Sequence, residues 1–192
     1  MNTALLKDIA EISSGLPYKR YVDDDGTDFD VVLQKSIKQD GQLDDFEQMK
    51  FRKFPDKYFS REGDILVKLA YPNDIVCLKK EDEGLVIGNR IAVIRLTRPD
   101  ICPRFIAQLL TNITVKEQLN RVKSPGRGAL VSISALKELE LDFPDYPTQV
   151  EYARLFDLIN DKIKVNQEII ESDRNLKEGL LNDLLEGGRN NE

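Results

Sequence analysis

Apolar residues follow different spacings in the two parts of this 192-residue chain. In the first hundred residues they form short runs separated by turn residues, which is typical of buried strands. From Thr148 to Glu186 there is no proline, and no glycine before Gly179. In this segment apolar residues recur every three or four positions, close to the ~3.5-residue period of a coiled-coil seam. The pattern predicts an α+β protein, in which a mixed, mostly antiparallel β-rich domain precedes one long C-terminal helix.

Turn residues divide the first hundred positions into candidate strands. Residues 23–26 and 39–42 are predicted turns, and residues 5–14 form a short helix or the start of a strand. The predicted strands are residues 30–34, 65–69 and 75–78, with 85–90 and 91–96 forming either a strand pair or one strand bent at Gly88.

The next fifty residues favour short helices. Pro103 suits the first turn of a helix, and residues 114–122 predict a second one. Ser134 is a candidate cap for a brief helical turn that ends at Lys137. Residues 139–144 alternate between apolar and polar side chains and end in proline, which predicts a terminal strand.

The predicted long helix presents a seam that needs a partner. At ~1.5 Å per residue it is roughly 55–60 Å long, whereas a domain of about 150 residues is nearer 35 Å across. Two polar members of the seam lie either on a solvated face or at positions that select helix register. The seam consists of Phe156, Ile159, Ile163, Asn166, Ile170, Asp173, Leu176, Leu180 and Leu184. We expect a domain at residues 1–147, a dimerisation or spacer helix at 148–186 and a disordered tail at 187–192.

Composition narrows the function classes. The chain contains no histidine, which removes the commonest general base and transition-metal ligand. Cys77 and Cys102 do not resemble a zinc site, and two cysteines in a chain of this size favour buried thiols. No apolar run has the length of a membrane span, and no secretory signal is visible. We therefore expect a cytoplasmic protein with no metal or cofactor, and an enzyme becomes less favoured, with catalysis by carboxylates or lysine left open.

Charge is distributed unevenly along the chain. Residues 1–85 carry 13 basic and 18 acidic side chains, a net charge of −5, and residues 138–192 carry 6 and 14, a net charge of −8. Residues 86–137 carry 9 and 2, a net charge of +7. Either the fold neutralises this segment locally, or it forms one basic face that binds phosphates.

Three segments have candidate chemistry. Residues 18–21 combine aromatic and basic side chains, which suits nucleic acid as well as an ordinary amphipathic surface. Residues 123–128 place two cations in a loop that lets backbone amides approach a phosphate, or form a mere connector. A metal-dependent nuclease is disfavoured because the spacing of its candidate residues is wrong. These candidates are Asp56, Glu62, Asp64 and Lys68.

Several weak motifs occur in an order that resembles the specificity subunit of type I restriction–modification systems. They are the opening segment 6–15, the Gly-Asp-Ile-Leu element at 63–66, the domain ending at 133–144, Gln149 at the start of the long helix and the Leu-rich close at 176–185. The match covers nearly the whole chain. It departs from the family pattern in separating Pro144 from Pro147 and in placing Thr148 before the glutamine.

The resemblance implies a DNA-recognition role. Family members carry two target-recognition domains in tandem, separated by antiparallel helices that act as a ruler, and each domain recognises half of a bipartite site. Adenine methyltransferase subunits, and in full systems restriction subunits, assemble on them. This chain resembles one half of such a subunit, which pairs with an identical copy or with another half. The residues expected to contact double-stranded DNA are Lys19, Arg20, Asn89, Arg90, Lys123, Ser124 and Arg127. The alternative is a protein-interaction adaptor that dimerises through its helix without specific DNA binding.

Overall fold

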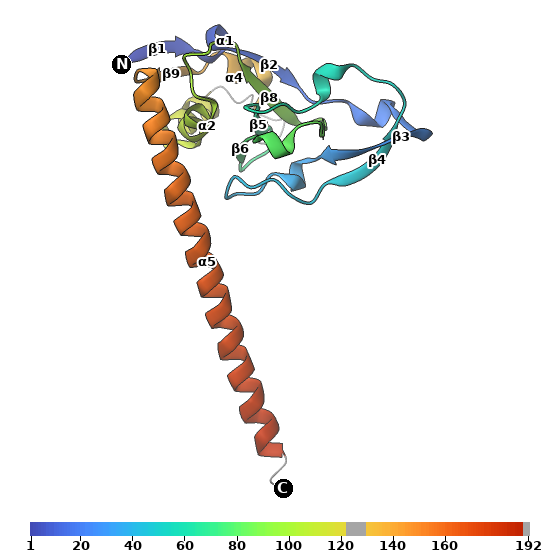
Figure 1. Ribbon diagram of the computed structural model, residues 1–192, viewed down its shortest axis with the longest axis vertical. Coiled ribbons are helices and arrows are strands. Elements are labelled where there is room, and N and C mark those ends of the chain that lie inside the picture. Colours follow the sequence, from blue (N-terminus) through green and yellow to red (C-terminus); the bar gives the residue numbers. More distant parts are fainter. Residues whose placement is uncertain (122–129, 190–192) are drawn as a thin grey trace. The chain divides into compact units, whose positions relative to one another are not determined.

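The computed structural model describes residues 1–121 and 130–189, with the side chains of residues 1–119 and 130–185. Its contacts divide the chain into two compact units, Met1–Ala153 and Arg154–Glu192. Within the described residues the strands form three sheets, and a long C-terminal helix follows them (Figure 1). The predicted α+β class is thereby confirmed.

The N-terminal segment combines both alternatives predicted for residues 5–14. Strand β1 (Asn2–Leu5) is followed by the short helix α1 (Leu6–Ile9) and by strand β2 (Ala10–Ser14). Strand β1 pairs antiparallel with β9 (Glu140–Phe143), the strand predicted at the end of the domain. This pairing places the start of the chain beside the end of the globular unit (Figure 1).

A four-stranded antiparallel sheet forms the centre of the first unit. Its order is β2, β8 (Ile91–Leu96), β5 (Ile65–Lys68) and β6 (Ile75–Cys77). The apolar runs that predicted β5, β6 and β8 are almost completely buried, which explains why they lack an alternating pattern. The β5–β6 hairpin confirms the strands expected in these two runs.

A smaller three-stranded sheet contains β4 (Glu47–Phe51), β3 (Val22–Val32) and β7 (Val86–Ile87) in that order. Strand β3 pairs antiparallel with β4 and parallel with β7. Apolar side chains from both sheets form one cluster, which joins the two layers. Its buried members are Val32, Ile37, Leu66, Val76, Leu78, Ile87, Ile91 and Val93.

Two predictions in this region are wrong, one about strands and one about a turn. Strands β7 and β8 are neither a pair nor one bent strand, because β7 joins β3 whereas β8 joins β2 and β5. Residues 23–26 are not a turn between elements but lie within β3, as an irregularity between Val22 and Thr27. In both places the pairing partner is remote in sequence, so the local pattern contains no information about it.

Short 3₁₀ helices connect these strands. They are η1 (Tyr18–Arg20), η2 (Gln34–Ser36), η3 (Asp56–Tyr58) and η4 (Lys80–Asp82). They complete the connections of the first unit and place charged side chains at its surface.

The α-helices of the first unit follow most of the sequence signals. Helix α2 (Pro103–Thr111) begins at the predicted proline, and α3 (Ile113–Arg121) lies within one residue of its predicted bounds. Helix α4 (Ile133–Lys137) ends where expected, but its cap is Ser132. The Ser132 hydroxyl accepts a hydrogen bond from the amide of Ala135, so Ser134, already inside the helix, is not the cap.

Helix α5 (Tyr146–Arg189) contains 44 residues, which corresponds to a length of roughly 66 Å at 1.5 Å per residue. Its first turns belong to the first compact unit, and the part beyond Ala153 forms the second. The helix continues through residues 187–189 of the expected tail, and residues 190–192 lie outside the described part of the chain.

Candidate nucleic-acid interface

Close backbone contact brings two predicted DNA-contacting segments together. Leu16 forms a parallel bridge with Gly88, and its amide donates to the carbonyl of Ile87 at 2.7 Å. A Cβ atom on Gly15 would lie 2.1 Å from the Gly88 carbonyl oxygen, so only glycine allows this approach. The segment that carries Lys19 and Arg20 therefore runs beside the turn that carries Asn89 and Arg90.

Arg90 holds an unusual backbone conformation. Its φ is 65°, in the left-handed region that non-glycine residues seldom adopt. Its carbonyl accepts hydrogen bonds from the Leu69 amide at 3.0 Å and from Gln34 Nε2 at 3.3 Å. These contacts support the strained turn and leave the Arg90 side chain exposed.

The third predicted segment, with Lys123, Ser124 and Arg127, lies outside the described residues. The chain resumes at Leu130, which bridges Ala70, and the Val131 amide donates to the Leu69 carbonyl at 2.7 Å. Leu69 thus connects the described end of this segment to the Arg90 turn.

Part of the positive charge of residues 86–137 is neutralised within the fold. The Arg95 guanidinium donates to both carboxylate oxygens of Asp64 at 2.7 and 2.6 Å, and Asp64 is only 1% exposed. The hydrogen bond with Asp64 raises the pKa of Arg95, so its guanidinium stays protonated. Arg98 similarly pairs with Asp100, whose pKa this hydrogen bond lowers. Within the described part of this segment, Arg95 and Arg98 are therefore engaged by carboxylates rather than left available for phosphate.

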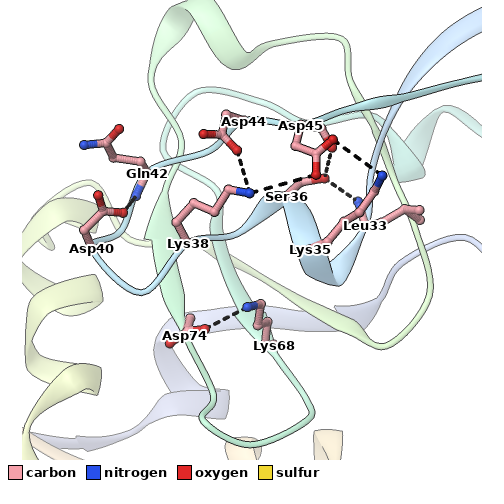
Figure 2. A network of polar contacts seen from close by, with 10 residues as sticks. All are labelled: Leu33, Lys35, Ser36, Lys38, Asp40, Gln42, Asp44, Asp45, Lys68 and Asp74. Atoms are coloured by element: carbon pink, nitrogen blue, oxygen red, sulfur yellow. Dashed lines mark hydrogen bonds and ion pairs between the residues drawn. The ribbon is translucent and has the colours of Figure 1, made fainter. Parts of the chain in front are cut away.

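Several lysines of the first unit are also paired. Figure 2 shows Lys38 directed toward Asp44 and Lys35 close to Asp45, in the connection between β3 and β4. It also shows Lys68 bonded to Asp74, at 2.7 Å between Nζ and Oδ2. These cations stabilise loops, and their ion pairs reduce their capacity for phosphate.

Arg52 is a candidate that the sequence analysis did not single out. Its backbone amide donates to the carbonyl of Tyr21 at 3.0 Å, and its Nη2 donates to the carbonyl of Arg20 at 2.7 Å. Its guanidinium carbon lies 5.7 Å from the centroid of the Tyr21 ring. Interleaved basic and aromatic residues at 50–54, the signal already recognised at 18–21, could have identified it.

The residues considered for a nuclease have separate structural roles. Asp64 binds Arg95, and Lys68 binds Asp74. The amide of Glu62 donates to Glu83 rather than joining a shared site. Across the described residues no three His, Cys, Asp or Glu side chains form a group that could hold a metal ion. The contacts of Glu62, Asp64 and Lys68 therefore stabilise the β-rich unit.

Gln149 explains one motif of the family resemblance. Its side chain is 1% exposed, its Oε1 accepts from the Cys102 amide at 2.9 Å, and its Nε2 donates to the Pro144 carbonyl at 2.9 Å. The glutamine thus fastens the first turn of α5 to two loops within the same unit.

The seam residues of α5 remain accessible. Ile163 is 46% exposed and Leu184 is 72% exposed, whereas Phe156 is half-buried. The seam's two polar members, Asn166 and Asp173, are also exposed. Figure 1 shows α5 as one continuous helix, so the predicted positions follow each other along an uninterrupted surface.

A second apolar stripe on α5 was missed by the sequence analysis. Leu158, Val165 and Ile169 are 59%, 53% and 52% exposed, at spacings of seven and four residues that lead on to Leu176. At 3.6 residues per turn this stripe is centred roughly 90° from the first one. A search for all apolar heptad positions, rather than the strongest set, could have found it. The helix therefore has two adjacent apolar surfaces.

None of the helices in the described ranges is long and apolar enough to span a membrane. Cys77 and Cys102 form no disulfide with each other.

Comparison with solved structures gives related folds. The HsdS subunit from Thermoanaerobacter tengcongensis has a TM-score of 0.70 and 16% identity, over 88% of this chain and 44% of that one. A chain from work on complex assembly and conformational transition of the type I R-M system has a TM-score of 0.71 and 16% identity, over 91% and 46%. The type I S subunit from M. genitalium has a TM-score of 0.55 and 18% identity, over 95% and 45%. The present chain thus spans less than half the length of each.

A search of curated proteins found no match. Residues 1–172 match the family described as type I restriction modification DNA specificity domain. This match covers most of the chain and agrees with the fold of the solved S subunits. The chain therefore belongs to the family of type I restriction–modification DNA specificity domains.

Proposed function

We propose that this chain is a sequence-specific DNA-binding subunit of a type I restriction–modification system. It recognises one half of a bipartite site, and methyl transfer is performed by separate adenine methyltransferase subunits that it positions. The observation that carries this proposal is a specificity-domain fold followed by a 44-residue helix with exposed apolar side chains along it.

The two stripes of α5 support two kinds of helical partner. The seam that includes Ile163 and Ile170 fits a second spacer helix, supplied by another copy of the chain or by another recognition half. The adjacent stripe that includes Val165 and Ile169 fits a helix of a methyltransferase subunit. Burying both stripes would remove most of the apolar surface that α5 exposes.

The globular unit supplies the DNA contacts in this proposal. Lys19, Arg20, Asn89 and Arg90 lie on adjoining segments, and arginine and asparagine are the residue types that bind guanine and adenine edges bidentately. With two copies related by a two-fold axis, the recognised halves would be inverted repeats separated by a spacer that α5 determines.

Selection from a random duplex pool tests the proposal. The full chain, alone and co-expressed with an adenine methyltransferase subunit, is incubated with the pool, and the bound DNA is sequenced. We expect enrichment of a split motif with a constant spacer, and inverted repeats if the partner is an identical copy. No enrichment in either sample would contradict the proposal and favour an adaptor that uses α5 alone.

A further inference from the structure

The position of Arg52 distinguishes it from the other exposed cations of the first unit. It directly follows β4, and its side chain is exposed although two hydrogen bonds and a ring contact connect it to Arg20 and Tyr21. An exposed arginine normally samples many rotamers, so these contacts preorganise the guanidinium for a ligand. Nη2 is used in the bond to Arg20, and the remaining N–H donors of the planar fork stay available.

The charge around Arg52 is mixed. In β3 both Val22 and Thr27 pair with Phe51, so the residues between them bulge out of the pairing. These residues include three consecutive aspartates, residues 23–25. A Cβ atom on Gly26 would lie 2.4 Å from the Phe51 carbonyl oxygen, so this acidic excursion stays against the residue that precedes Arg52. Among the described residues, none of these carboxylates forms an ion pair with Arg52.

This combination is unfavourable for a phosphate and favourable for a base edge. The three aspartates belong to the excursion that packs against Phe51, the residue before Arg52, so a phosphate that approaches this excursion meets like charge. In the major groove, by contrast, arginine binds O6 and N7 of guanine bidentately, and a carboxylate accepts from N4 of the paired cytosine. An arginine held in place next to the strand residue that this aspartate-bearing excursion packs against thus supplies donors for guanine, and the neighbouring segment carries acceptors suited to cytosine.

We propose that Arg52 is a specificity-determining residue that recognises guanine in the half-site, with Tyr21 and the Arg20 carbonyl as its positioning groups. This inference rests on the proposed DNA-binding function. It assigns to Arg52 a base contact, whereas Lys19, whose ammonium lacks the planar fork, is suited to the phosphate backbone.

The test compares Arg52→Lys, Arg52→Ala and the unchanged chain, each with the methyltransferase subunit, in the same duplex selection. Lysine retains the charge but not the bidentate fork. Both variants are expected to lose a guanine preference at one position of the motif, by roughly 5- to 150-fold in relative enrichment. The salt dependence of binding by Arg52→Lys is expected to equal that of the unchanged chain.

Two results would overturn the inference. One is an unchanged base preference in Arg52→Lys. The other is a salt slope that falls by about one in Arg52→Ala while the preference is retained, which would identify a phosphate contact. Lys137→Ala, an exposed cation on α4, serves as the matched control, and melting curves show whether each variant is folded. If the unchanged chain enriches no motif, the proposed function fails, which is a different outcome from a motif that Arg52 does not influence.

Discussion

Residues 1–153 and the remainder of α5 differ in how far their apolar side chains are buried. In the first unit apolar side chains such as Leu66 and Ile91 are completely buried, and buried polar groups such as Asp64 and Gln149 have hydrogen-bond partners. In α5 beyond Ala153, Ile163 and other large apolar side chains are about half exposed or more. The first unit is stabilised by its own contacts, whereas the second leaves its large apolar side chains accessible, as a surface for a partner would.

The largest effect is expected from a double substitution that weakens the association of α5 with a partner and leaves the first unit intact. Ile163→Asp combined with Ile170→Asp removes two seam side chains, each worth about 1.5–3 kcal/mol when buried. Pairing with a partner helix should weaken by more than 100-fold, as measured by sedimentation of the chain with and without an added adenine methyltransferase subunit. The melting temperature of the first unit should change little.

Lys164→Asp combined with Glu168→Asp is the matched control, because both positions lie on the face opposite the apolar stripes. Equal association of the Ile163/Ile170 variant and this control would show that the seam is not an interface.

The reverse experiment damages only the first unit. Asp64→Ala leaves Arg95, which is 23% exposed at its side chain, without its carboxylate partner. Breaking a buried pair in this way costs about 3–5 kcal/mol, so the denaturation midpoint of the first unit should fall sharply. Asp64→Leu combined with Arg95→Met should recover much of this stability, since it removes both charges together. A double variant as unstable as Asp64→Ala would indicate that the pair has a role beyond charge compensation.

Replacing Gln149 tests how the first turn of α5 is attached to the rest of the first unit. Gln149→Leu leaves the Cys102 amide and the Pro144 carbonyl without their side-chain partner. We expect a loss of about 1–3 kcal/mol in the free energy of unfolding by urea. Thr148→Val, at the neighbouring position, should have a smaller effect. If Gln149→Leu is as stable as the unchanged chain, these hydrogen bonds do not contribute to the docking of the first turn.

The smallest expected effect concerns a helix cap. Ser132→Ala removes the hydroxyl that accepts from the Ala135 amide and should destabilise the first unit by about 1 kcal/mol. Ser134→Ala should be nearly neutral in the same thermal unfolding measurement. The opposite order would support the cap predicted from the sequence alone.

The sequence predicted the positions of helices and strands better than it predicted which strands pair with each other. Local signals correctly located α2 at Pro103, the strands β5 and β6 and the long helix, because each depends on residues close together in the chain. The separation of β7 from β8 was missed because strand pairing depends on contacts with Val31 and Lys68, many residues away.

The candidate DNA contacts show the same limit. Lys19 and Arg90 were chosen for residue type, and the structure places their segments side by side through Leu16 and Gly88. Their role in DNA binding stays a prediction, as do the roles of Lys123, Ser124 and Arg127. The local pattern at 50–54 could have pointed to Arg52, but only the contacts with Arg20 and Tyr21, more than thirty residues earlier, show that its guanidinium is held in place.

The sequence by itself determined that a β-rich region is followed by a long C-terminal helix, since helical periodicity is a local property. It also contained the motifs of the specificity family, which the family match confirmed. Only the tertiary structure decided which charges remain available, because Arg95 and Asp64 neutralise each other across 31 positions while Arg52 retains its exposed fork. Charge is set by residue type, but its availability depends on which groups the fold brings within hydrogen-bonding distance.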